Sequence, residues 1–228
     1  MNGLRPKELA AKSATNGIRI AVSVVTIVGC LAIGYFSSDA KEAIGKISGF
    51  IIAMASIPYI VSIFKNGTRP SRTTWWIWTM LSILISLSYH ESGASNTLWV
   101  PIVYVGDQLI VALISLTRYG EGGRGKLDIA CMTGAFIGVL LWWLSGSAVL
   151  ALAAFISADL FGSVPTIEKS RIRPESEDIF AWVMTVTGNT LNIFAAERLV
   201  PEILAYPFYA AITSGVILYF LLRRKIKV

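Results

Sequence analysis

The feature that most constrains this sequence is a series of long apolar segments separated by short polar connectors. An α-helix needs about 20 mostly apolar residues to cross the hydrocarbon core of a bilayer. Eight segments approach that length: residues 18–36, 43–64, 73–89, 97–117, 127–144, 148–167, 179–196 and 203–222. These segments predict an all-α, polytopic membrane protein with eight transmembrane helices.

The composition agrees with a membrane protein and disfavours most other classes. Hydrophobic residues make up 54% of the 228 residues and charged residues only 15%, whereas soluble domains carry about 25% charged residues. A soluble enzyme, a disordered chain, a disulfide scaffold and a DNA-binding domain are therefore disfavoured. The two cysteines, Cys30 and Cys131, are expected at different depths of their helices and hence unpaired.

The distribution of lysine and arginine predicts the orientation of the helices. Loops that stay in the cytoplasm are enriched in these residues. With the N-terminus inside, all but three of the 20 basic residues fall on the inner side, the exceptions being Lys41, Lys46 and Arg198. We therefore expect both termini in the cytoplasm, with the chain in a bacterial inner (plasma) membrane. The basic residues are read as topology signals beside the lipid bilayer, and nucleic acid is not expected as a partner.

This orientation divides the chain into five parts. They are a cytoplasmic N-terminal segment (1–17), a first transmembrane repeat (18–117), a cytoplasmic loop (118–126), a second transmembrane repeat (127–222) and a basic cytoplasmic tail (223–228). The sequence Ile27-Val28-Gly29-Cys30 loosely resembles a lipoprotein cleavage site, which leaves open whether the first helix is retained. The apolar run that continues through residues 31–36 favours a retained, spanning helix.

A short pattern occurs twice and divides the chain into similar halves. Each copy has a proline near the inner end of a span, then Arg-Pro in a basic loop, and then a tryptophan eight residues after the second proline. The two copies are Pro58, Arg69-Pro70 and Trp78, and Pro165, Arg173-Pro174 and Trp182. A later helix carries Tyr104 in the first half and Tyr209 in the second. The order of these features predicts an internal repeat.

This arrangement resembles the SWEET and PQ-loop superfamily of transporters, with an extra helix at the N-terminus. In that superfamily, two parallel three-helix bundles are joined by a single linking helix. The resemblance implies that the last seven predicted helices form this unit, and that tryptophan and asparagine side chains from both bundles flank a substrate. Trp78, Trp182 and Asn192 are the matching positions. Tyr59 and Thr166 stand where the signature glutamine of the family follows the proline.

Two carboxyl groups lie within predicted spans. Asp107 is near the centre of the fourth span and Asp159 near the middle of the sixth. An acid at the bilayer centre costs about 2.5–3.5 kcal/mol on insertion scales, so it marks a functional site by default. We interpret both as proton- or cation-binding groups in a central cavity, and the alternative is a hydrogen-bonded acid that braces two helices.

The seventh span adds a polar stripe. Thr185, Asn189 and Asn192 follow the i, i+4, i+7 spacing that places side chains on one helix face. Asparagine both donates and accepts hydrogen bonds, which suits a polar solute, although such residues also join helices in bundles. The residues predicted to bind the solute are Trp78, Tyr104, Gln108, Trp182, Asn189, Asn192 and Tyr209.

The remaining tryptophans and two prolines receive simpler interpretations. Trp75, Trp76, Trp99, Trp142 and Trp143 are expected in an aromatic belt at the membrane interfaces. Pro58 and Pro165 are candidate hinges, because each removes a backbone donor from its helix.

The sequence offers little support for an enzyme. It contains a single histidine, His90, and no Cys/His cluster with metal-ligand spacing, so neither a metal nor a cofactor is expected. Residues 168–178 carry charges of both signs and are predicted to form a solvated cytoplasmic loop.

The leading prediction is a transporter of a small polar solute that works by alternating access between two pseudo-symmetric repeats. Facilitated diffusion and proton coupling both remain open. The alternative is a non-transporting membrane scaffold or sensor. The predicted partners are the lipid bilayer and a small-molecule solute, and a homo-oligomer is left open.

Overall fold

The protein is all-helical over the part that the structure describes. A computed structural model describes residues 6–65, 67–91, 93–145 and 148–223, which form eight α-helices, a 3₁₀ turn and no strand. The elements are α1 (Pro6–Phe36), α2 (Ala40–Phe64), α3 (Arg72–Glu91), α4 (Trp99–Ser115), α5 (Lys126–Ser145), α6 (Ala148–Ile172), η1 (Pro174–Ser176), α7 (Ile179–Phe194) and α8 (Pro201–Arg223). The predicted all-α class is confirmed.

The helix boundaries depart from the prediction mainly at α1 and α6. α1 begins at Pro6, within the segment expected to precede the first span, and α6 runs beyond residue 167 to Ile172. Polar and basic residues therefore extend these two helices past their apolar portions. Four of the basic residues used to assign orientation, Arg5, Arg224, Lys225 and Lys227, lie outside the described residues.

Three helices in the described part of the chain are long and apolar enough to cross a membrane. They are residues Thr15–Phe36 of α1, Ala40–Phe64 of α2 and Ile203–Arg223 of α8, while α4 and α7 are shorter apolar helices. On α1, large apolar side chains stay exposed, with Leu31 at 69% and Tyr35 at 83%. These helices are compatible with insertion into a bilayer.

Side-chain caps fix the starts of two helices. The Asp39 carboxylate accepts the N–H of Glu42, and the Asp178 carboxylate accepts the N–H of Ala181, each at 2.9 Å. Such N-caps satisfy donors that have no partner within the helix. Pro58 and Pro165 lie inside α2 and α6, and both helices continue past them. Their role as hinges stays a prediction.

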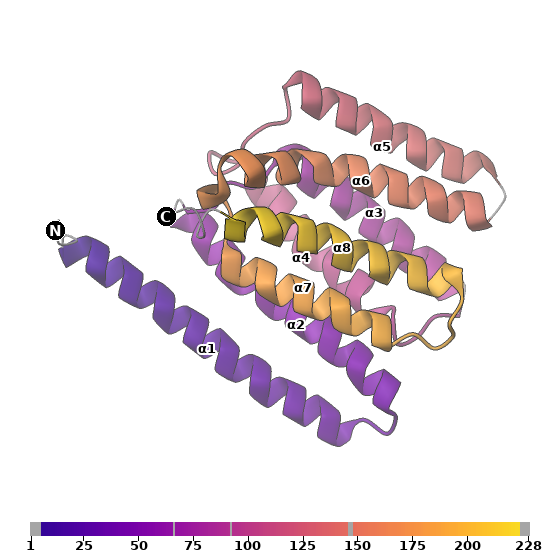
Figure 1. Cartoon of the computed structure of the whole chain (residues 1–228), viewed down its shortest axis with the longest axis horizontal. Helices are drawn as coiled ribbons and strands as arrows, with labels where there is room; N and C mark the ends of the chain where they lie inside the picture. Colours follow the sequence, from indigo (N-terminus) through magenta and orange to yellow (C-terminus); the bar gives the residue numbers. More distant parts are fainter. Residues whose placement is uncertain (1–5, 66, 92, 146–147, 224–228) are drawn as a thin grey trace.

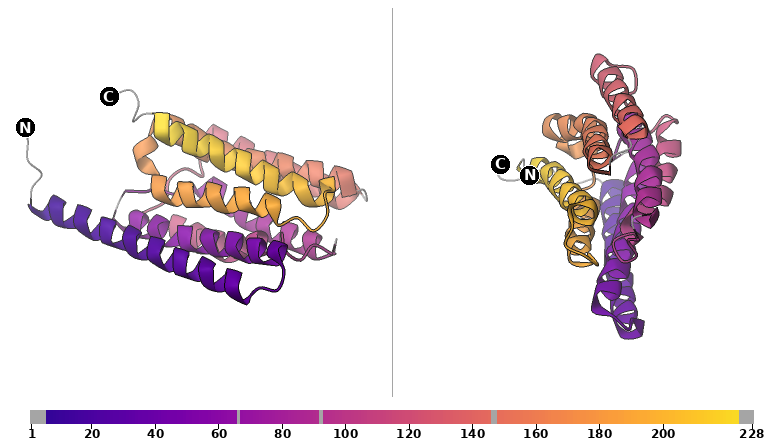
Figure 2. Two further views of the ribbon diagram at one scale, coloured as in Figure 1. Left: turned by 60° about the horizontal axis from the view of Figure 1, so that its bottom comes forward. Right: turned by 90° about the vertical axis from the view of Figure 1, so that its right-hand side faces the viewer.

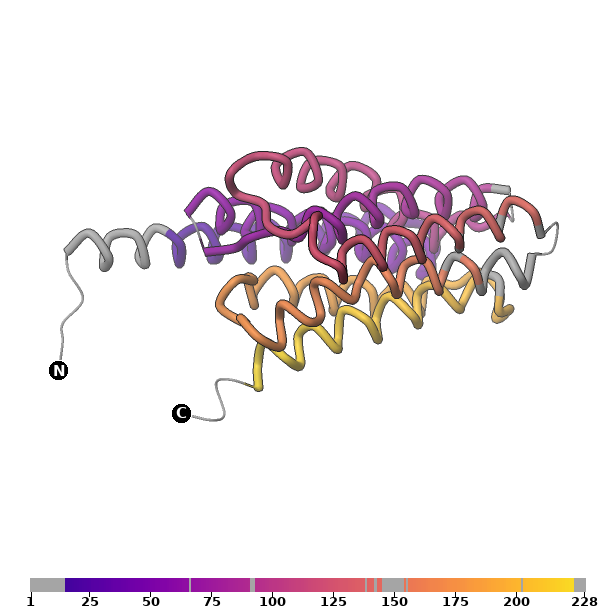
Figure 3. The backbone as a smooth tube through the Cα atoms, turned by 90° about the horizontal axis from the view of Figure 1, so that it is seen from above, coloured from indigo at the N-terminus to yellow at the C-terminus, as the bar shows by residue number. Residues whose placement is uncertain are grey.

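The helices form two layers that face each other (Figures 1 and 2). In one layer α4 packs against both α2 and α3, and in the other α8 packs against both α6 and α7. The layers meet where α2 packs on α7 and α3 packs on α6, and Figure 3 shows α2–α4 on one side and α6–α8 on the other. α1 packs on α2 and α5 packs on α6, at the two edges of the assembly.

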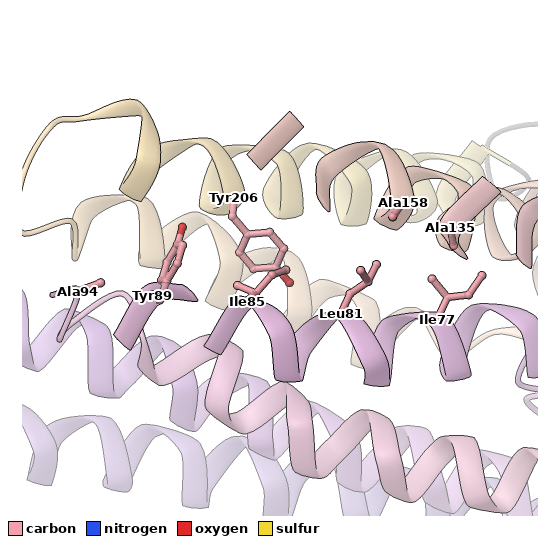
Figure 4. Close-up of a cluster of buried hydrophobic side chains, with 8 residues drawn as sticks. All are labelled: Ile77, Leu81, Ile85, Tyr89, Ala94, Ala135, Ala158 and Tyr206. Atoms are coloured by element: carbon pink, nitrogen blue, oxygen red, sulfur yellow. The ribbon is translucent and has the colours of Figure 1, made fainter. Parts of the chain in front are cut away.

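One face of α3 illustrates how the layers are joined. Ile77, Leu81, Ile85 and Tyr89 recur every fourth residue and are all buried, so they form one stripe along the helix. Figure 4 shows this stripe facing Tyr206 of α8, Ala158 of α6 and Ala135 of α5. Burying this stripe removes apolar surface from solvent, which stabilises the contact between layers.

Candidate binding cavity

A cavity lies between the two layers, with about 740 Å³ of space not filled by atoms, counting the part open to the outside. Side chains from α2, α3, α4, α6, α7 and α8 line it. The structure brings together seven of the predicted site residues here: Trp78, Tyr104, Asp107, Gln108, Asp159, Trp182 and Asn189. Pro58 and Pro165 lie outside the cavity lining, each buried within its helix.

Asp159 enters the cavity from α6 and is 8% exposed. The Tyr209 side chain of α8 lies close to its carboxyl group. The neighbouring Ser163 hydroxyl donates to the backbone oxygen of Asp159 at 2.9 Å and accepts the indole N–H of Trp78 at 3.3 Å. Tyr209 therefore lies beside Asp159 without itself lining the cavity, which differs from its predicted role at the solute.

Asp107 enters from α4, in the opposite layer. It is half-buried, and Ser56 of α2 lies close to its carboxyl group. Its second oxygen, Oδ2, is buried and has no hydrogen-bond partner. The adjacent Gln108 is 6% exposed and its Oε1 atom is likewise without a partner. Two buried acceptor atoms at this wall thus lack a hydrogen-bond partner within the protein.

Asn189 of α7 also lines the cavity and belongs to a separate hydrogen-bond network. Its Oδ1 accepts the Tyr104 hydroxyl at 2.9 Å, and its Nδ2 donates to Ser214 Oγ at 3.3 Å. Thr185, one turn earlier, also lines the cavity. These contacts link α4, α7 and α8 around the cavity.

Asn192 lies outside the cavity lining, although sequence spacing placed it with Asn189. Its Nδ2 donates to the backbone oxygen of Thr97 at 3.3 Å, near the start of α4. Asn192 lies on nearly the same helix face as Thr185, which does line the cavity, but about two turns further along α7. The difference is therefore the neighbour that this face meets, because near the end of α7 it meets Thr97 instead of the cavity.

An aromatic cluster lines the part of the cavity nearest the starts of α3 and α7. The rings of Trp78 and Trp182 lie 6.3 Å apart between centroids, one from each layer. Trp75 packs 5.4 Å from Trp78 and 5.2 Å from Tyr59. The assignment of Trp75 to the interfacial belt is wrong, because this side chain lines the cavity. Its i, i+3 spacing from Trp78 on α3 was the available signal.

The place of the other belt tryptophans at a membrane interface stays a prediction. Trp76, Trp99 and Trp143 are exposed on the outer surface. The side chain of Trp142 lies outside the described residues. Sequence reasoning missed several further lining residues, namely Ser56, Tyr59, Tyr206, Thr213 and Ser214.

The end of the molecule where α2, α4 and α6 finish, called the basic end here, contains a buried ion pair. Lys169 of α6 pairs with Glu177, and their side chains are 5% and 0% exposed. Glu177 also accepts the Trp182 indole N–H at 2.9 Å and the Tyr59 hydroxyl at 3.3 Å. Lys169 donates in addition to the backbone oxygen of Arg69, in the connection between α2 and α3.

The prediction of a fully solvated loop at residues 168–178 is therefore wrong. Glu177 and Asp178 are buried, while Glu168 and Arg171 form an exposed ion pair. Asp178 pairs with Arg19 of α1 at 2.7 Å. The loop folds against the aromatic cluster, and a buried charge is tolerated there because an opposite charge and hydrogen-bond donors meet it.

At the opposite end, a single carboxylate joins the two layers. Glu197, between α7 and α8, accepts the backbone N–H groups of Ser95, Asn96 and Thr97, which precede α4. Partial burial opposes ionisation, but these three N–H groups hold the pKa of Glu197 below its usual value of 4.5. Lys41 reinforces this contact by donating to the backbone oxygen of Ala196 at 2.8 Å.

Acid is expected to loosen the Glu197 contact. A carboxyl group with a lowered folded pKa stabilises the folded state above its unfolded pKa, and this contribution disappears as the pH falls through the folded value. We therefore expect hydrogen-exchange protection of the amides at residues 95–97 to fall below pH 4.5. In Glu197→Gln the protection at pH 6 should already be reduced severalfold and should vary little with acid.

Glu42→Gln is the matched control for this experiment. Glu42 lies at the same end and forms a half-exposed ion pair with Lys46 within α2. Its replacement should leave exchange at residues 95–97 unchanged. Equal protection in wild type and Glu197→Gln at pH 6 would contradict the assignment.

Metal binding finds no support in the part of the chain that the structure describes. These residues contain no group of three or more His, Cys, Asp or Glu side chains arranged to hold a metal ion. The chain matches no protein-family model, no curated protein and no solved structure. The cavity and its contacts are thus the basis for a functional conclusion.

Proposed function

We propose that this chain is a membrane transporter of a small polar solute that works by alternating access. In this proposal all eight helices span the membrane, and both termini lie in the cytoplasm. Helices α2–α4 and α6–α8 are two parallel repeats, α5 links them, and α1 is an additional helix packed on α2. This is the organisation of a divergent SWEET-like protein.

The pattern of helix contacts supports the two-repeat organisation. In each set of three, the last helix packs against the other two. The contacts between sets are also paired, since α2 packs on α7 and α3 packs on α6. A twofold operation that exchanges α2 with α6, α3 with α7 and α4 with α8 would preserve all of these contacts.

The observation that carries the proposal is the cavity between the layers, with one carboxyl group from each. Asp107 of α4 and Asp159 of α6 both line it. Acidic residues within a membrane are expensive and usually mark substrate or ion pathways. The cavity also contains amide, hydroxyl and indole groups, the mixture of a few polar groups with apolar walls that is typical of ligand sites.

The closing contacts at the two ends suggest how access alternates. Lys169 and Glu177 join the layers at the basic end through Arg69 and Tyr59, and Glu197 joins them at the opposite end through residues 95–97. Opening one set while the other stays closed would expose the cavity to one side at a time. Trp78 and Trp182 would shield the solute, Asn189 would orient it, and Pro58 and Pro165 would absorb the bending.

Solute permeation in proteoliposomes tests the proposal directly. The purified full chain is reconstituted, and shrinkage and re-swelling after osmotic shock are followed by light scattering for glucose, glutamine and agmatine. We expect at least one solute to enter at least tenfold faster than into protein-free liposomes. Protein-free rates for all three solutes would contradict transport of this class of solute.

The scaffold alternative is favoured by one observation, the presence of hydrogen-bonded contacts between layers at both ends. A scaffold would keep both sets closed. In that case the backbone amides in segments 95–97 and 173–178 would stay fully protected from hydrogen exchange in liposomes. Glucose, glutamine and agmatine would all permeate at the protein-free rate.

A further inference from the structure

The charge of the cavity lining is entirely negative. Asp107 and Asp159 are its only ionisable acid or base side chains apart from tyrosine, and no lysine, arginine or histidine is found among the described residues that line it. Lys169 lies close by at the basic end but is neutralised by Glu177. The lining therefore attracts a cation and repels an anion.

Several hydrogen-bond donors of the lining are used within the protein. The Tyr104 hydroxyl donates to Asn189, the Trp78 indole to Ser163, and the Trp182 indole to Glu177, whereas the buried indole N–H of Trp75 has no partner. The amide nitrogen of Asn189 likewise donates to Ala210 and Ser214.

Two acceptors at the cavity also lack a partner within the protein. Asp107 Oδ2 and Gln108 Oε1 are buried on one wall without a hydrogen-bond partner. Buried polar atoms are nearly always hydrogen-bonded in folded proteins, so each unsatisfied one requires an explanation. A ligand that supplies N–H donors would satisfy both atoms.

Aromatic rings complete the environment of a cation. Tyr59, Trp75, Trp78 and Trp182 line one part of the cavity. The faces of such rings attract ammonium and guanidinium groups, most strongly for tryptophan.

We propose that the ligand of this cavity is a small organic cation that carries N–H donors, such as a guanidinium or primary ammonium compound. This inference rests on the proposed function and specifies its substrate class. The cationic group lies between Asp107 and Asp159, its N–H groups donate to Asp107 Oδ2 and Gln108 Oε1, and its apolar portion packs on Trp78 and Trp182. A sugar fits less well, because it carries no charge to pair with the two carboxyl groups.

A pair of probes of nearly equal shape isolates the role of charge. n-Butylguanidinium and n-butylurea are titrated at pH 8 into the full chain in detergent, with tryptophan fluorescence as the signal. We expect the cation to bind at least tenfold more tightly than the neutral urea. Asp107→Asn should abolish that preference, whereas Glu168→Gln, which removes an exposed carboxylate of α6 outside the cavity, should retain it.

The outcomes separate this inference from transport itself. Equal affinities for the two probes, no saturable binding of n-butylguanidinium, or an unchanged preference in Asp107→Asn would overturn it. If Asp107→Asn does not fold, Asp159→Asn serves in its place, and the preference of the wild-type protein is decisive alone. Glucose flux without cation preference would leave transport standing and reject the cation. Cation preference without any flux would support the cation and contradict transport.

Discussion

Replacing Lys169 with methionine is expected to lower the free energy of unfolding by about 3–5 kcal/mol, the usual cost of leaving one member of a buried ion pair unpaired. The Glu177 side chain is 0% exposed and would lose its counter-ion while staying shielded from water. Its remaining donors, the Trp182 indole and the Tyr59 hydroxyl, are uncharged and compensate only in part. Thermal unfolding of the purified chain in detergent measures the change.

Two further variants test the cause of that loss. Lys126→Met removes an exposed lysine at the start of α5 and should leave the unfolding temperature almost unchanged. Combining Lys169→Met with Glu177→Gln removes both charges, so it should recover part of the stability. A single Lys169→Met variant as stable as Lys126→Met would contradict the role assigned to the buried pair.

The helices were predictable because a long apolar run leaves the backbone few alternatives. In a bilayer every backbone N–H and C=O must be satisfied within the segment, which selects helices. The polar ends of the helices were less certain, because that constraint applies only to segments inside the bilayer. Beyond residue 167, for instance, α6 continues through Lys169, whose charge is satisfied by Glu177 rather than by water. The sequence shows that residue 169 is charged, but it does not show which residue pairs with it.

Within the candidate site, only the residues that cost the most free energy to place in a membrane were predictable from the sequence. Asp107 and Asp159 stood out because an acid in an apolar segment is rarely accidental, and both line the cavity. Tyr59 and Trp75 did not stand out, since aromatic residues near the ends of a span are equally typical of an interface. Their place in the cavity depends on how α2 and α3 pack against α7 and α6, which no local pattern contains.

The pairing of helices also explains why Asn192 was placed wrongly. Helical spacing gives the face on which a residue lies but not the neighbour that the face meets. One side of α7 meets the cavity at Thr185 and Asn189, and further along the helix Asn192 meets Thr97. The change of neighbour along one helix is a tertiary property.

The largest functional effect is expected from the two cavity acids. If they bind protons or a cationic group during transport, Asp107→Asn and Asp159→Asn should each reduce permeation of glucose, glutamine or agmatine, whichever the wild type carries, by at least tenfold. Asparagine keeps the size of the side chain and its capacity to hydrogen-bond but removes the ionisable group. Light scattering on proteoliposomes measures the flux.

A pH-sensitive dye inside the same proteoliposomes distinguishes coupling from facilitated diffusion. Proton coupling predicts that solute entry changes the internal pH in wild type and in Glu168→Gln, and that the change disappears in both cavity variants. Facilitated diffusion predicts solute entry with no pH change in any of them. Each variant must first keep its helical circular dichroism and unfolding temperature. A variant that loses stability but carries solute at the wild-type rate would show that its carboxyl group braces helices, which is the role a scaffold would give it.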